Sequence, residues 1–259
     1  DGSRGVKFGH DLEAMLAAID ADTRVVFIAN PNNPTGTWLA ERELRAFVER
    51  VPGNVIVVID EAYFEYVSEP DYPNAVQWLG EFPNLLVTRT FSKAYGLAAL
   101  RIGYGVSQAP LADILNRVRQ PFNVNSFALA AALAALADQD HLSASVQANR
   151  AGMQQLVAGL RALRLYFIPS VGNFVAVDVR RDAGRVYEQL LREGVIVRPV
   201  ENYAMPGYLR ISIGLPAENR RCIAALEEIL SHDPLAKVII VSGNSERSNA
   251  VLAVQRGAH

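Results

Sequence analysis

Residues 90–101, with the sequence Thr-Phe-Ser-Lys-Ala-Tyr-Gly-Leu-Ala-Ala-Leu-Arg, form the stretch that decides the fold. The stretch lies between two apolar runs, residues 85–87 and 102–106, which predict buried strands. A lysine in a small-residue loop between buried strands is poorly placed to be a surface charge. Because burial disfavours the ammonium form, we expect Lys93 to be partly deprotonated and nucleophilic near neutral pH.

Three polar side chains accompany this lysine along the chain. Thr90, Ser92 and Arg101 offer two hydroxyls and a guanidinium, a combination suited to gripping a phosphate. We therefore interpret Lys93 as a Schiff-base lysine beside a cofactor phosphate. Ordinary solvated or turn-forming roles for Thr90 and Ser92 stay open as the alternative.

Composition excludes several classes of protein. The 259 residues are 50% hydrophobic and 20% charged, which is ordinary for a soluble globular protein. A net charge of −2 gives no electrostatic reason to expect nucleic acid or an anionic membrane as a partner, and no apolar run reaches the roughly 20 residues of a membrane span. One cysteine suits a reducing compartment, so we expect a cytoplasmic protein. The four histidines and one cysteine show no metal-ligand spacing, so we expect no metal site.

Strands and helices alternate through the first part of the chain. Short apolar runs predict strands at residues 24–29, 54–59, 84–88 and 100–106, and helical spacing predicts helices at 10–21 and 41–51. This alternation predicts an α/β fold with a mainly parallel sheet, in which ligands bind beyond the carboxyl ends of the strands. Asn33, Asp60 and Lys93 all lie just past predicted strand ends, so we expect them to share one site.

The pattern becomes helical beyond residue 110 and then mixed. Helices are predicted at residues 111–118, 127–137, 141–163, 185–193 and 216–230, and strands at 166–168, 174–179, 195–199 and 208–213. We predict a large cofactor-binding domain at 1–140, a linking helix with a small C-terminal domain at 141–230, and a tail of unknown role at 231–259. The tail contains a possible strand at residues 237–241.

Four motifs in this order resemble those of the fold-type I, pyridoxal-phosphate-dependent aminotransferases. The motifs are Asn-Pro-Thr-Gly at 33–36, Asp-Glu-Ala-Tyr at 60–63, Ser-Lys at 92–93 followed by Arg101-Ile-Gly, and Arg-Ile-Ser-Ile-Gly at 210–214. The resemblance implies a large domain of the mainly parallel, seven-stranded type, incomplete here, and a smaller α+β C-terminal domain. Within the family, residues 119–126 resemble the histidinol-phosphate aminotransferase group.

The resemblance assigns a role to each residue around the cofactor. Lys93 would form the Schiff base with the aldehyde of pyridoxal 5′-phosphate and move the substrate proton. Asp60 would pair with the pyridine nitrogen and, although buried, keep a lowered pKa. The alternatives are a surface lysine for Lys93 and a turn cap for Asp60.

Further contacts to the cofactor follow from the same resemblance. Tyr63 and Asn33 would hydrogen-bond its phenolic oxygen, and Ala62 would pack against one face of its ring. Thr90, Ser92 and Arg101 would hold its phosphate. The resemblance also implies a cis bond between Asn33 and Pro34, although Asn-Pro also favours plain turns without any ligand.

Arg210 is an arginine in an otherwise apolar predicted strand, which is costly unless an anion meets it. The resemblance implies that it clamps the α-carboxylate of the amino acid, with Asn173 lining the same pocket. A structural ion pair for Arg210 and a simple Gly-Asn turn at Asn173 are the alternatives.

The resemblance implies a homodimer that exchanges an amino group between L-histidinol phosphate and 2-oxoglutarate in histidine biosynthesis. A threonine-phosphate decarboxylase and a catalytically inactive, truncated aminotransferase are the alternatives. The family has a substantial segment before the Asn-Pro-Thr-Gly strand that this chain does not match. We therefore expect uncovered apolar surface and unpaired strand edges in the sheet. Residues 232–259 also fail to match the family.

Overall fold

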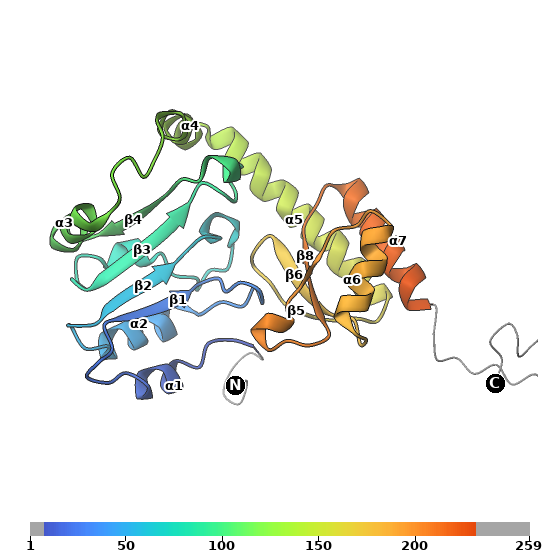
Figure 1. The fold of residues 1–259 in the computed structure, drawn as a ribbon, viewed down its shortest axis with the longest axis horizontal. Helices are drawn as coiled ribbons and strands as arrows, with labels where there is room; N and C mark the ends of the chain where they lie inside the picture. The colour runs from blue at the N-terminus through green and yellow to red at the C-terminus, as the bar shows by residue number, and fades with distance from the viewer. Residues whose placement is uncertain (1–7, 232–259) are drawn as a thin grey trace, which may run out of the picture.

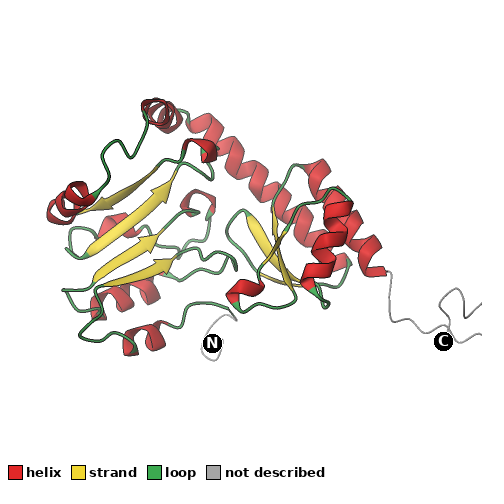
Figure 2. Ribbon diagram, in the orientation of Figure 1, coloured by secondary structure: helices red, strands yellow, loops and turns green. Residues whose placement is uncertain are grey.

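The computed structural model describes residues 8–231, which form two sheets connected by helices (Figures 1 and 2). Sheet A has the strand order β1-β2-β3-β4, and sheet B has the order β5-β6-β8-β7. The strands of sheet A are β1 (Val25–Ala29), β2 (Ile56–Asp60), β3 (Leu85–Thr90) and β4 (Gly103–Ser107). Those of sheet B are β5 (Tyr166–Ile168), β6 (Phe174–Asp178), β7 (Arg198–Pro199) and β8 (Tyr208–Ser212).

Strands β1, β2 and β3 are parallel, so the predicted mainly parallel α/β sheet is confirmed. Their ends are in register, because Ala29 pairs with Asp60 and Asp60 pairs with Thr88. Strand β4 runs antiparallel to β3. The connection between them contains only the 3-10 helix η3 (Ala98–Leu100), whereas a parallel crossover normally uses an α-helix. Because η3 takes up residues 98–100, β4 begins three residues later than predicted.

One face of sheet A is covered by helices α1 (Leu12–Ala17) and α2 (Glu41–Arg50). Helix α2 places Leu44, Phe47 and Val48 on one side at helical spacing, and all three are buried. They pack in one cluster with Ile28 of β1 and other strand residues. Helix α1 is shorter than predicted, since it begins only after its N-cap residue Asp11.

The other side of β1 carries exposed apolar side chains. Side chains alternate along a strand, so Val25 and Phe27 point away from the face that Ile28 shares with α2. Phe27 is 69% exposed and Val25 is 41% exposed. The expected uncovered apolar surface is therefore present on this strand, which is an edge of sheet A.

A long helix connects the two sheets. Helices α3 (Ala109–Val118) and α4 (Ser126–Ala137) follow sheet A, and α5 (Gln139–Ala162) runs from α4 to sheet B (Figure 1). Helices α6 (Ala183–Arg192) and α7 (Pro216–Ser231) complete the second core. That core contains Leu156, Leu160, Val177, Leu209 and Leu226, each fully buried. The apolar residues of α5 and α7 therefore pack against sheet B.

Some predicted elements differ in extent or lie outside the described residues. Strand β7 is two residues long, whereas the sequence predicts a strand at 195–199. The 3-10 helix η2 (Ala75–Trp78) lies between β2 and β3. The possible strand at 237–241 lies outside the described residues. The predicted division near residue 140 falls at the start of α5 and stays a prediction.

No helix within residues 8–231 combines the length and the apolar character needed to cross a bilayer. Across the same residues, no cluster of three or more His, Cys, Asp or Glu side chains could hold a metal ion.

Candidate active site

A cavity of about 410 Å³ opens at the carboxyl ends of β2 and β3. Its volume is in the range of small-molecule sites. Six of its ten lining residues are residues that the sequence analysis selects. The ten are Asp60, Ala62, Thr88, Arg89, Thr90, Ser92, Lys93, Arg101, Ile102 and Gly103.

Lys93 lies in the tight turn that follows β3. The Gly96 N–H donates to the Lys93 carbonyl at 2.9 Å, and Gly96 adopts φ +74°, which favours glycine. Phe91 and Ala94 are buried, but Lys93 itself is only partly buried. Its Nζ lies 5.2 Å from the centroid of the Tyr63 ring. The turn is thus anchored by its apolar neighbours, while the amine reaches the cavity.

Asp60 is the last residue of β2 and is exposed, so the expectation of a buried carboxylate is wrong. The strand ends where the cavity opens, which leaves the side chain in contact with solvent. Its Oδ1 accepts hydrogen bonds from the Ala62 N–H at 3.1 Å and from the Thr88 hydroxyl at 3.3 Å. These two bonds orient the carboxylate.

The predicted phosphate-binding residues gather at the same cavity. The Thr90 hydroxyl accepts from the Ser92 N–H at 3.0 Å and donates to the Ile102 carbonyl at 3.4 Å. Arg101 adopts the left-handed conformation, and its Nη1 donates to the Ala98 carbonyl at 2.9 Å. The residues that line the cavity therefore include one with a carboxylate, one with an amine, three with hydroxyls and two with guanidinium groups. This donor set fits a cofactor that combines a basic ring nitrogen, an aldehyde and a phosphate.

A second group of predicted residues meets around Phe174 of β6. The Tyr63 ring is buried and packs edge-on against the Phe174 ring, with centroids 5.2 Å apart. The Arg210 guanidinium lies 5.1 Å from the same ring. Phe174 thus connects residues that follow β2 with residues of β8. The sequence analysis missed it, although it directly follows Asn173.

Arg210 donates from Nη1 to the Asn33 side-chain oxygen at 2.5 Å, across 177 residues of sequence. Its Nε is buried and has no acceptor among the described residues. A buried donor without a partner is costly, so this atom fits an anion-binding role. The predicted cis bond between Asn33 and Pro34 is confirmed, and a second cis bond joins Asn30 to Pro31.

Asn173 lies at the start of β6, outside the set of cavity-lining residues. Its carbonyl accepts from the Ile213 N–H at 2.9 Å, which ties it to the end of β8. The structure therefore places Asn173 directly before β6 and next to the end of β8, rather than among the cavity-lining residues that include Lys93.

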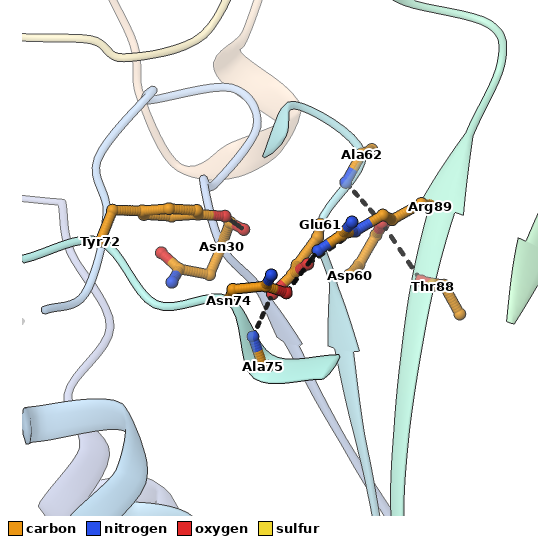
Figure 3. A network of polar contacts seen from close by, with 9 residues as sticks. All are labelled: Asn30, Asp60, Glu61, Ala62, Tyr72, Asn74, Ala75, Thr88 and Arg89. Carbon is orange, nitrogen blue, oxygen red and sulfur yellow. Dashed lines mark hydrogen bonds and ion pairs between the residues drawn. The ribbon is translucent and has the colours of Figure 1, made fainter. Parts of the chain in front are cut away.

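A buried ion pair lies next to the cavity residues, and the sequence analysis missed it (Figure 3). Glu61 is 0% exposed and accepts from Arg89 Nε at 2.9 Å, from Arg89 Nη2 at 2.7 Å and from the Ala75 N–H at 3.0 Å. Burial raises the pKa of Glu61, an effect that the charge of Arg89 opposes. Every described partner of this carboxylate is a donor, so it acts as the ionised form. The signal in the sequence is a charge directly beside Asp60 and another between Thr88 and Thr90.

The family model for aminotransferase class I and II matches residues 4–226. Histidinol-phosphate aminotransferase 2 of Pseudomonas fluorescens is 64% identical over 224 residues, which are 86% of this chain and 60% of that protein. The protein of the same name from Pseudomonas aeruginosa is 62% identical and covers 87% of this chain and 61% of its own length. The chain thus spans about 60% of the length of these relatives.

Solved structures show the same likeness. Histidinol-phosphate aminotransferase from Sinorhizobium meliloti, in complex with pyridoxal-5′-phosphate, has a TM-score of 0.78 and 36% identity over 85% of this chain and 61% of its own. L-threonine-O-3-phosphate decarboxylase from Porphyromonas gingivalis has a TM-score of 0.72 and 25% identity over 83% of this chain and 67% of its own. The family match, the sequence relatives and the strand-end geometry agree, and the chain belongs to the class I and II aminotransferase family.

Proposed function

We propose that this chain carries the cofactor site of a cytoplasmic histidinol-phosphate aminotransferase. The reaction exchanges an amino group between L-histidinol phosphate and 2-oxoglutarate, in histidine biosynthesis, with pyridoxal 5′-phosphate as the cofactor. The observation that carries the proposal is that Lys93 and Asp60, selected from different motifs, line one cavity of suitable size. The identity to relatives with this activity supports the substrate.

Bound pyridoxal phosphate supplies an aldehyde that condenses with amines and a ring that withdraws electrons when its nitrogen is protonated. Lys93 would hold the cofactor aldehyde through its amine and, once the substrate amine has replaced it there, would be free to move the proton of the substrate α-carbon. Asp60 holds the ring-nitrogen proton by its charge, and its bonds to Ala62 and Thr88 keep the carboxylate oriented. The two residues therefore have separate tasks on one ring.

The remaining residues bind and orient the cofactor. Thr90, Ser92 and Arg101 hold the phosphate through hydroxyl and guanidinium donors. Ala62 faces the ring, where its single methyl leaves room, and Tyr63 and Asn33 hold the phenolic oxygen by hydrogen bonds.

Arg210 binds the carboxylate of the amino-acid or oxo-acid substrate, with Asn173 at the edge of that pocket. Its buried Nε supports this role, because an incoming carboxylate gives that N–H an acceptor. The bond from Nη1 to Asn33 holds the guanidinium plane while Nε stays available.

The test uses the small number of lysines in the chain, which are Lys7, Lys93 and Lys237. We expect added pyridoxal phosphate to give a visible absorbance band, and borohydride reduction to attach the cofactor to Lys93, as read by peptide mass mapping. Lys93→Ala should lose both the band and the label, while Lys7→Ala, the matched control, should keep them. Label spread evenly over Lys7 and Lys237, or a band that survives in Lys93→Ala, would contradict the proposal.

There are two further candidates. The likeness to the threonine-phosphate decarboxylase favours a decarboxylase on the same site, and product analysis separates the two, because only the decarboxylase releases carbon dioxide. The second candidate is cofactor binding without turnover. A rise in melting temperature on adding pyridoxal phosphate, with no detectable transamination, would identify that case.

A further inference from the structure

The Glu61 carboxylate and the Arg89 guanidinium extend from the strand ends on the side opposite Asp60 and Thr88, although Arg89 is also among the residues that line the cavity. Asp60 and Thr88 are register partners, and Glu61 and Arg89 are the next residues along the same two chains. Successive residues of extended chain point to opposite faces, and Figure 3 shows Glu61 and Arg89 directed toward Asn74 and Ala75. The Glu61 N–H also donates to the Thr88 carbonyl at 2.9 Å.

The pair connects three segments of the chain, which are residues 61–64, residues 74–75 and strand β3. Arg89 Nη2 reaches the Asn74 side-chain oxygen at 2.8 Å, and the Ala75 N–H bonds to Glu61. The Arg89 guanidinium also stacks 3.6 Å from the centroid of the Phe64 ring. Phe64 directly follows Tyr63, so the contacts extend to the turn that carries Ala62 and Tyr63 toward the cavity.

Both members are shielded from water, since the side chains of Arg89 and Glu61 are 14% and 0% exposed. Charges in such a place interact strongly and are costly to leave alone. Asp60 is the immediate neighbour of Glu61, and Thr88 that of Arg89. Removing either of the two buried charges therefore changes the electrostatic potential at the Asp60 carboxylate.

We propose that Glu61 and Arg89 are positioning residues of the cofactor site. Two hydrogen bonds from Arg89 to Glu61 Oε2 hold the register partners Asp60 and Thr88 in place at the cavity that Lys93 also lines. The cancellation of the two charges sets the potential at Asp60 and hence its hold on the ring-nitrogen proton. This inference rests on the proposed function, because it needs a basic ring beside Asp60.

The sign of the electrostatic effect distinguishes positioning from a merely structural role. Glu61→Gln leaves the positive charge of Arg89 uncompensated close to Asp60. Because that charge repels a proton, it disfavours the protonated form of the bound cofactor. We expect the pH midpoint of the visible absorbance transition to fall by about 1 unit. In the double variant Glu61→Gln/Arg89→Met both charges are gone, so the midpoint should return toward that of the unmodified chain. If the pair had only a structural role, the pH midpoint of the double variant would not return toward that of the unmodified chain.

Geometry is tested separately from charge. Arg89→Lys keeps the positive charge but loses the two-pronged contact, so it should leave the midpoint in place and weaken pyridoxal-phosphate binding several-fold. Arg89→Lys also provides the test if Glu61→Gln does not fold. Glu81→Gln, in the exposed pair that Glu81 forms with Arg45, is the matched control and should change neither quantity.

Unfolding curves without cofactor show which variants keep the fold. An unchanged midpoint in a folded Glu61→Gln, or a double variant displaced further than the single one, overturns the inference. So does an Arg89→Lys chain that binds the cofactor normally. Absence of the cofactor band from the unmodified chain overturns the proposed function and this inference together, whereas a normal band there with an unchanged Glu61→Gln midpoint overturns the inference alone.

Discussion

Arg210 carries a hydrogen-bonding group that the described part of the chain does not use. Its Nη1 bonds to Asn33 and its plane lies near Phe174, yet Nε is buried without an acceptor. A guanidinium held on two sides, with a third N–H that has no acceptor among the described residues, has the arrangement that the proposed carboxylate-binding role requires. This arrangement gives a residue-scale test of the substrate pocket.

We expect Arg210→Gln to weaken the binding of 2-oxoglutarate by about 10- to 100-fold, because a charge-assisted bond contributes roughly 1.5–3 kcal/mol. Binding is measured by the change that the oxo acid causes in the absorbance of the bound cofactor. Pyridoxal-phosphate affinity should stay within a few-fold, since Arg210 does not line the cofactor cavity. Arg220→Gln, on the exposed side of α7, is the control, and equal losses in both variants would contradict the assignment.

Cys222 is the only cysteine of the chain and lies buried in α7. Burial raises the pKa of its thiol from 9.0 to about 11, so the thiolate population at pH 8 is smaller than that of an ordinary thiol. We expect the folded chain to react with a thiol reagent at least tenfold more slowly than the urea-unfolded chain, as followed by the release of a coloured thiolate. Equal rates in the two states would show that α7 does not cover this residue.

At the scale of elements, the segment after β1 makes a close approach to sheet B. Gly36 adopts φ +76°, and a Cβ there would overlap the Ser170 side chain and lie 2.9 Å from the Ser170 Cα. The Val171 N–H donates to the Gly36 carbonyl at 3.1 Å. Glycine is thus required both by the backbone conformation and by the space.

We expect Gly36→Ala to destabilise the chain by about 1–3 kcal/mol, read from urea unfolding. Gly53→Ala is the matched control, because no atom lies within 4 Å of its added Cβ and its φ is not positive. That control should change the free energy of unfolding by less than about 0.5 kcal/mol. Similar losses in both variants would mean that Gly36 is not a special position.

The elements with a clear apolar period were predictable from the sequence. The meeting of the polar residues that follow β2 and β3 at one edge of the sheet was predictable too. The runs at β1, β2 and β3 predicted parallel strands, and the polar residues after β2 and β3 do line one cavity. The direction of β4 was not predictable from its composition, because a strand reads the same in either direction. The burial of Asp60 was predicted wrongly, since a strand's apolar run does not show where its last residue meets solvent.

Contacts across long sequence separations were the hardest to predict. Nothing local in the sequence indicates that Phe174 packs between Tyr63 and Arg210. The charges beside Asp60 and between Thr88 and Thr90 are visible in the sequence, but their pairing depends on the fold. These contacts depend on the placement of sheet B and on the register of β3 beside β2. A motif selects residues by type and order. It therefore does not identify residues outside the motif that hold the motif residues in place.

At the scale of the whole molecule, helix α4 is apolar on nearly every side but poorly covered. Phe127, Leu129, Leu133 and Leu136 are 80%, 52%, 71% and 46% exposed. A helix that is apolar all round is normally buried, and exposed patches of this kind mark association surfaces. These residues support the homodimer that the family resemblance implies, and we propose α4 as its contact surface.

We expect the chain to sediment or scatter light as a dimer, and Leu133→Glu to shift it toward the monomer by at least tenfold in dissociation constant. Leu191→Glu, at a 45% exposed leucine on α6, is the control and should leave the dimer intact. A monomer at every concentration before any substitution would rule out the homodimer. Equal weakening by both substitutions would remove α4 as the contact surface.

The bond between Arg210 and Asn33 also sets an order of events during synthesis. Its two ends are 177 residues apart, so a chain growing on the ribosome exposes Asn33 long before its partner is made. Sheet A can form early, because all its strands precede residue 108, but its loop after β1 lacks its guanidinium until translation has passed β8. Under the proposed function, recognition of the substrate carboxylate would therefore be acquired only late in translation, after Lys93 is already in place.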